Sequence, residues 1–155
     1  MGYHTEFTGK FLLDKPLSKE DLTFLQKFNE TRRMKRNVDK KFGIEGEFFV
    51  DGTGYAGQDV DSTVSNGNQP PKTQPGLWCQ WRPNDEGTEI EWDGGEKFYA
   101  YVEWLQYLID NIFSPRGYTL NGEVEWYGED SDDRGKIVVE NNVVTTKKGT
   151  IVYED

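Results

Sequence analysis

Few residues of the chain carry the side chains that most often do covalent or acid–base chemistry. Cys79 is the one cysteine and His4 the one histidine in 155 residues. Cys79 lies near tryptophans in a predicted strand and has no partner base in view, which is typical of a buried thiol. His4 lies close to an end of the chain that is expected to fray, so it can join a catalytic triad only if that end docks. We therefore predict no catalytic residue of these types and no cofactor.

Two pairs of glutamates could do acid–base or metal-assisted chemistry. Glu89 and Glu91 are two residues apart in one predicted strand, and Glu123 and Glu125 in another, so each pair projects from one strand face. Alternating glutamates are more typical of a face that is solvated. A carboxylate-based, metal-dependent hydrolase is therefore the last of three hypotheses, and we predict no dedicated metal site.

Two loop motifs resemble known sites only in part. Residues 52–57 fit the pattern G-x-G-x-x-G after a predicted strand, but no amphipathic helix follows that could hold a pyrophosphate. Residues 130–135 begin like a calcium loop, but Arg134 occupies a ligand position and Asn141 stands where the bidentate glutamate should be. We interpret the first motif as a flexible glycine turn and the second as an acidic hairpin turn.

Charge is segregated along the sequence. The chain has a formal net charge of −10, yet a predicted basic patch contains Arg32, Arg33 and Arg36. Residues 85–133 hold fourteen acidic residues against Lys97 and Arg116. Such fields steer association and partner choice, and a net charge of −10 argues against direct nucleic-acid binding. The predicted acidic face comprises Glu89, Glu91, Glu123, Glu125, Asp130, Asp132 and Asp133.

Aromatic residues crowd the second half of the chain, which holds all five tryptophans. Strand alternation places Trp78 and Arg82 on one side of a strand and Trp81 with Cys79 on the other. A tryptophan beside an arginine suits a base, a sugar or a partner side chain. The predicted binding face on the strands comprises Trp78, Arg82, Trp92 and Trp126.

The elements that must position these residues follow from periodicity and capping. Ser18 is a good helix N-cap with Asp21 three residues later, and it predicts a helix to about residue 34. A second helix is predicted to open at Gly94 and to end before Pro115 and Gly117. Strands are predicted at residues 6–13, 44–51, 77–82, 88–92, 120–127, 136–140 and 143–144, with a long loop at 52–76 and a loose tail after 147.

The pattern predicts a single α+β domain over residues 1–155. Its antiparallel-rich sheet has about six to seven strands, with two helices packed on one face. The helix starts at Ser18 and Gly94 are 76 positions apart, as are residues 46–48 and 122–124, which suggests a duplicated strand-helix-strand unit. No apolar stretch is long enough to cross a bilayer and no secretory signal is recognisable, so we expect a cytoplasmic protein.

Three segments carry a resemblance to a family of small uncharacterised proteins of bacteria and their phages. They are residues 76–83 (GLWCQWRP), 92–99 (WDGGEKFY) and 121–126 (NGEVEW). The resemblance extends over roughly residues 43–145. It implies a cytosolic bacterial or phage protein and carries over no catalytic residues.

The leading hypothesis from the sequence is a noncatalytic acidic binding protein, phage-encoded, that inhibits a host protein through a protein–protein interaction. The alternative is a binder or sponge for a nucleotide-like small molecule, enclosed by Trp78, Arg82, Trp92 and the 52–76 loop. A homo-oligomer is compatible with either hypothesis.

Overall fold

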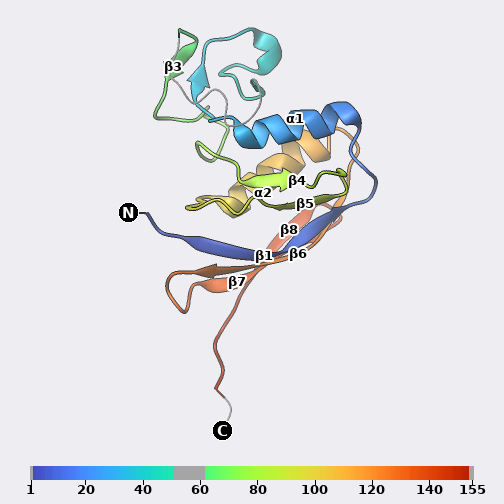
Figure 1. Ribbon diagram of the computed structural model, residues 1–155, viewed down its shortest axis with the longest axis vertical. Coiled ribbons are helices and arrows are strands. Elements are labelled where there is room, and N and C mark those ends of the chain that lie inside the picture. The colour runs from blue at the N-terminus through green and yellow to red at the C-terminus, as the bar shows by residue number, and fades with distance from the viewer. Residues whose placement is uncertain (1, 51–61, 154–155) are drawn as a thin grey trace.

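The computed structural model describes residues 2–50 and 62–153, and it contains an α+β fold as predicted. The main sheet is antiparallel and six-stranded, in the order β4-β5-β1-β6-β7-β8, while β2 and β3 pair separately. Figure 1 shows α1 and α2 together in the upper half, with the β2–β3 region beyond α1. The elements are β1 (Thr5–Leu13), α1 (Lys19–Glu30), β2 (Lys35–Arg36), the short 3-10 turn η1 (Lys40–Phe42), β3 (Val64–Asn66), β4 (Trp81–Pro83), β5 (Glu89–Trp92), α2 (Tyr101–Leu108), its π-helical continuation η2 (Ile109–Phe113), β6 (Leu120–Gly128), β7 (Arg134–Glu140) and β8 (Val143–Lys148).

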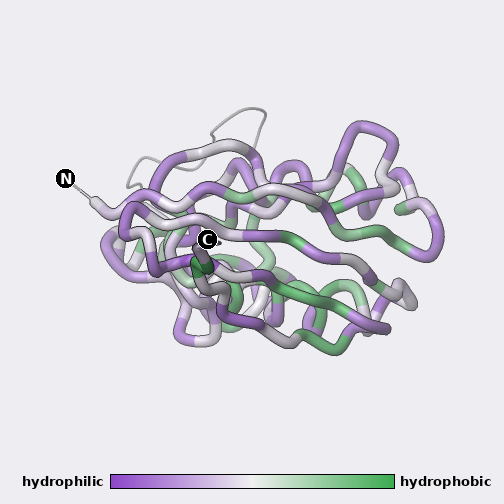
Figure 2. Tube along the Cα trace, turned by 90° about the horizontal axis from the view of Figure 1, so that it is seen from below, coloured by the Kyte–Doolittle hydropathy of each residue, from purple (hydrophilic) through white to green (hydrophobic). Residues whose placement is uncertain are grey.

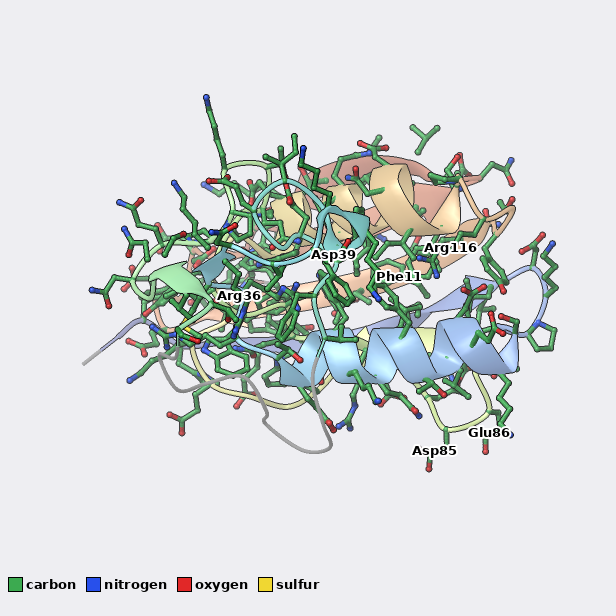
Figure 3. All side chains as sticks on the ribbon, turned by 90° about the horizontal axis from the view of Figure 1, so that it is seen from above. Phe11, Arg36, Asp39, Asp85, Glu86 and Arg116 are labelled. Atoms are coloured by element: carbon green, nitrogen blue, oxygen red, sulfur yellow. The ribbon has the colours of Figure 1, made fainter. Side chains whose placement is uncertain are left out.

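The alternation of β1 and β6 divides the sheet into a buried face and an open face. Phe7 lies opposite Trp126 and Phe11 opposite Gly122 on the buried face, whereas Thr8 lies opposite Glu125 on the open face. Phe11 has no exposed surface, and Figure 3 shows it between the two helices. The view from the other side, in Figure 2, shows much of the chain there as hydrophilic. The helices therefore cover one face of the sheet, and charged side chains occupy the other.

Helix α1 begins where the sequence predicts. The Ser18 side chain accepts a hydrogen bond from the Asp21 backbone N–H at 3.1 Å, which satisfies a donor at the helix end. Leu25 and Phe28 face the core. The helix ends at Glu30, earlier than predicted, because the Thr31 N–H bonds the Phe28 carbonyl and the chain becomes extended.

Helix α2 begins seven residues later than Gly94, where its start was predicted. Lys97 and Ala100 adopt positive φ of 59° and 55°, which a helix does not allow. Phe98 matches the helical apolar spacing, but it instead anchors the loop before α2, with its ring centroid 5.3 Å from that of Trp81. Phe98 is therefore apolar because it packs against the core from this loop, and its helical spacing does not mark a helix.

The predicted strand at 44–51 is wrong over residues 44–50, which form bends and turns. Glu47 is only 9% exposed, and one of its carboxylate oxygens accepts the Glu45 N–H at 2.7 Å. The alternation of acidic and apolar residues thus reflects a local turn. Because the strand at 46–48 is absent, the strand equivalence behind the proposed duplication is absent too.

The other predicted strands differ mainly at their ends. The strand predicted at 77–82 is β4, which begins only at Trp81, while those at 6–13, 88–92, 120–127 and 136–140 agree with the structure within two residues. The last strand, β8, extends to Lys148, beyond the predicted 143–144, and the following residues to 153 form no helix or strand. The described part of the predicted long loop contains β3. No helix among the described residues is long and apolar enough to cross a membrane.

Candidate functional site

A polar cleft of about 690 Å³ lies between α1 and the turn that joins β4 to β5. Helix α1 contributes one polar flank, and β4, β5 and their turn contribute the other wall. The cleft borders β4, which is an edge strand of the sheet. The lining residues are Thr23, Gln26, Lys27, Asn29, Glu30, Arg82, Pro83, Asn84, Asp85, Glu86 and Glu91.

The turn wall of the cleft is held by Asn84. Its side-chain oxygen accepts the N–H groups of Thr88 at 2.8 Å and Glu89 at 3.0 Å. Gly87 closes the turn with a φ of +70°, a conformation that favours glycine. In Figure 3, Asp85 and Glu86 project outward from this turn beside α1. Both carboxylates therefore extend from a turn whose backbone is held by the hydrogen bonds to Asn84.

The helix wall is tied to the body of the protein by Asn29. Its side-chain amide donates to the Cys79 carbonyl at 2.8 Å and to the Asp93 carboxylate at 3.0 Å. Asn29 is 5% exposed, so these bonds lie in a water-poor environment, where a lost partner is costly. Asn29 therefore fixes the end of α1 against the segment that leads into β4.

Negative charge predominates around the cleft. Four carboxylates, from Glu30, Asp85, Glu86 and Glu91, face two cations, Lys27 and Arg82. Arg82 and Glu91 are direct cross-strand neighbours, which lets them compensate each other. The remaining carboxylates and the amide of Gln26 offer oxygen acceptors to a ligand that carries N–H donors. The cleft thus suits a cationic group such as a lysine or arginine side chain.

The aromatic and arginine face predicted on the strands is not formed. Trp92 lies opposite the buried Trp81, whereas Arg82 points to the open face with Glu91. Trp126 also points to the helix side, where its indole N–H bonds the Asp133 carboxylate at 3.0 Å. Trp78 precedes β4 and is half-buried, so strand alternation does not place it beside Arg82. The prediction places Trp78 beside Arg82 because it starts this strand at residue 77, whereas β4 begins at Trp81.

The predicted acidic face separates into two regions. Glu89, Glu91, Glu123 and Glu125 share the open face of the sheet. Cations are interleaved with them: Lys10 pairs with Glu89 at 2.8 Å, and Lys136 pairs with Glu123 at 3.4 Å. The open face therefore carries both signs of charge.

The other three predicted acids, Asp130, Asp132 and Asp133, lie in the turn between β6 and β7. Asp133 is occupied there, since it accepts the Tyr3 hydroxyl at 2.7 Å in addition to the Trp126 indole. This contact docks the N-terminal segment, which the sequence predicted to fray.

The predicted basic patch is not a surface patch. Arg33 and Arg36 are only 1% and 3% exposed, and their guanidinium groups each lie 4.3 Å from the ring centroid of Phe28 and Phe49 respectively. Arg33 donates to the carbonyls of residues 46 and 47, and burial lowers its pKa to about 10. Arg32 is half-buried and donates to the Gly67 carbonyl. These arginines fasten the segment after α1 to the core.

Cys79 is fully buried, and burial raises the pKa of its thiol to about 12. Its thiol lies 3.8 Å from the Trp81 carbonyl, which accepts its weak hydrogen bond. A thiol in this environment is not a nucleophile near neutral pH.

Within the described ranges, no group of three or more histidine, cysteine, aspartate or glutamate side chains is arranged to hold a metal ion. The G-x-G-x-x-G motif at 52–57 lies outside the described residues.

Sequence reasoning missed most of the cleft. The helix side shows a signal that could have been found, since Thr23, Gln26, Lys27 and Glu30 recur at three and four positions on one polar flank of α1. No sequence pattern singled out the turn residues Asp85 and Glu86 as part of a site.

Comparison with protein-family models, with curated proteins and with solved structures found no match. The resemblance to a bacterial and phage family stays a prediction.

Proposed function

We propose that the chain is a noncatalytic acidic binding protein that takes a cationic segment of a protein partner into the cleft beside β4. The observation that carries the proposal is the excess of carboxylates in a cleft of about 690 Å³. Lysine and arginine side chains donate hydrogen bonds to carboxylates and gain Coulomb attraction, so they are the natural complement.

The lining of the cleft favours this occupant over a nucleotide-like molecule. None of the lining residues in the described part of the chain is aromatic, so these residues offer no ring that could stack on a base. The excess of carboxylates also repels phosphate groups. An extended basic peptide fits better, because the cleft runs beside an edge strand and has polar groups on both walls.

A binding titration tests this proposal. The probe is a fluorescent nine-residue peptide of alternating arginine and glycine, measured by anisotropy in 50 mM and 150 mM NaCl, with a glutamate–glycine peptide as its counterpart. We expect the arginine peptide alone to bind, more weakly at higher salt. The double variant Asp85→Asn and Glu86→Gln should weaken binding about fivefold, since each exposed pair contributes about 0.5 kcal/mol.

A matched variant separates the cleft from the overall charge. Glu123→Gln with Glu140→Gln removes the same charge from exposed strand positions outside the cleft. If both double variants weaken binding equally, the peptide responds only to net charge and the proposed site is wrong. Binding of the two peptides with equal affinity would also overturn it.

A further inference from the structure

Three cations gather on the open face of the sheet, where β7 pairs with β8. Lys136 lies opposite Glu125 of the open face on one side and opposite Lys147 on the other. Arg134 is two residues before Lys136, so its side chain projects from the same face. Like charges that are directly opposite in a strand pair repel each other and destabilise it. The fold therefore keeps a repulsive lysine pair here, although the whole chain carries a net charge of −10.

The three cations line a pocket of about 260 Å³ that also includes Gly149. The Gly149 N–H donates to the Arg134 carbonyl at 2.8 Å, which continues the strand pairing just past β8. The φ of Gly149 is not in the left-handed region, so its backbone conformation does not require glycine. A side chain would instead change the available space, because a Cβ at this position would lie 3.2 Å from the Arg134 Cγ. The bare backbone of Gly149 thus keeps room beside Arg134.

Positive charge predominates in this pocket. Glu125 supplies the one carboxylate among its described lining residues, and that carboxylate accepts a hydrogen bond from the Tyr127 hydroxyl. Lys148 also borders the pocket, but it lies opposite Gly135, so its side chain projects to the other face of β8. The three cations of the open face against one carboxylate leave a net charge of about +2 in the pocket.

The guanidinium of Arg134 is oriented while its terminal nitrogens stay available. Its Nε donates to the Ser131 carbonyl at 2.8 Å, and its central carbon lies 5.7 Å from the ring centroid of Tyr127. The ion pairs of the described residues include neither Arg134 nor Lys147. Lys136 pairs with Glu123 at 3.4 Å, but the Glu123 side chain is 57% exposed, and such a pair is weak. The cations are therefore free to bind an anion.

We propose that this pocket binds the phosphoryl group of a small phosphomonoester. A phosphoryl group carries a charge of about −1.5 to −2 near neutral pH and three acceptor oxygens, which match the charge and the number of the cations. The Arg134 guanidinium can bind two of these oxygens in parallel, and the lysines bind as point charges. A bound dianion also relieves the repulsion between Lys136 and Lys147.

The size and place of the pocket fit this ligand. A phosphoryl group is only a few times the volume of a water molecule, about 30 Å³, so the pocket leaves room for a small organic group beside the Tyr127 ring. The pocket borders β8, whereas the cleft proposed for a cationic segment borders β4 at the opposite edge of the sheet. The two sites are therefore separate, and either can fail its test without affecting the other.

Titration of the ¹⁵N-labelled full chain, followed by the NMR shifts of its backbone amides, tests the proposal. The titrants are phenyl phosphate, orthophosphate and benzoate, in phosphate-free buffer at pH 7.5 with 150 mM NaCl, where charges beyond about 8 Å are screened. We expect phenyl phosphate to shift the amides of residues 134–136 and 147–149 with a dissociation constant of about 1 mM. Benzoate, which has a single charge, should bind about tenfold more weakly. Tighter binding of phenyl phosphate than of orthophosphate supports an ester, and equal affinities would replace it by the free phosphate ion.

Three variants separate the pocket from the overall charge. Lys147→Gln should weaken binding of phenyl phosphate about fivefold, because it removes one cation of the pocket. Gly149→Val should weaken it as much without any change of charge, because its side chain occupies the room beside Arg134. Lys40→Gln removes the same charge as Lys147→Gln at an exposed position of η1 outside the pocket, and it should bind like the native chain.

Four results would overturn the proposal. Phenyl phosphate at 20 mM could leave the amides of residues 134–136 and 147–149 unshifted, or benzoate could bind as tightly as phenyl phosphate. Lys40→Gln could weaken binding as much as Lys147→Gln, which would show a response to net charge alone. Gly149→Val could bind with native affinity, which would place the ligand outside this pocket.

Discussion

Replacing Asp21 by asparagine tests how the start of α1 is fastened to the rest of the protein. The Asp21 carboxylate accepts the Tyr118 hydroxyl at 2.7 Å and the Arg116 guanidinium at 2.6 Å, from residues almost one hundred positions away. Burial raises the pKa of this carboxyl, but the hydrogen bonds from Tyr118 and Arg116 outweigh it, so its pKa lies below the usual value of 3.8. The charged form is therefore the one that stabilises the fold.

The expected cost follows from these contacts. Asparagine keeps a neutral hydrogen bond with Tyr118, so the loss there is the difference between a charged and a neutral bond, about 1 kcal/mol. The ion pair with Arg116 is partly exposed and contributes about 0.5 kcal/mol. Removing a negative charge from the first turn of a helix costs about 0.5 kcal/mol more. The free energy of unfolding should thus fall by about 2 kcal/mol.

Urea denaturation followed by tryptophan fluorescence at several pH values measures this loss. Because the folded-state pKa is lowered, the stabilisation is fully present above the unfolded pKa of 3.8 and disappears as the pH falls through the folded value. The difference between native chain and variant should therefore be constant from pH 7 to about 5 and should shrink below pH 4.

Glu20→Gln is the matched control for Asp21→Asn, because Glu20 is an exposed acid in the same helical turn. It should change the free energy of unfolding by about 0.5 kcal/mol at most. An Asp21→Asn variant as stable as the Glu20 control at pH 7 would refute the reasoning. So would a difference that persists unchanged at pH 2.

Three further predictions concern single residues. Ser18→Ala should lower the free energy of unfolding by about 1 kcal/mol, measured by urea denaturation, because the helix loses its capping acceptor. Asn141→Val should lower it by about 1–2 kcal/mol while Asn141→Gly changes little, because φ is +48° at this turn position; equal effects of the two would contradict this. Cys79 should react with an aromatic disulfide reagent only after unfolding, because its thiol is buried and its pKa is raised to about 12; rapid labelling of the native protein would show otherwise.

The sequence by itself determined the features that depend on neighbours a few positions apart. The Ser18 cap and the alternation of β6 are set by local hydrogen bonding and by the two-residue period of a strand, so both agree with the structure. The fold class followed from the same local patterns. The strand predicted at 44–51 failed because its alternation was a consequence of turn contacts around Glu47.

Only the tertiary structure decided which charged and aromatic side chains are accessible. In the sequence, Arg33 belongs to a run of basic residues, but in the structure it is buried against Phe28. Burial depends on which side chains pack against a residue, and not on its neighbours in the sequence. The cleft has the same origin. Its walls come from α1 and from a turn more than fifty residues later, which meet only because α1 packs beside β4. No local sequence pattern predicts this contact between α1 and the turn, because the packing of the whole core brings the two walls of the cleft together.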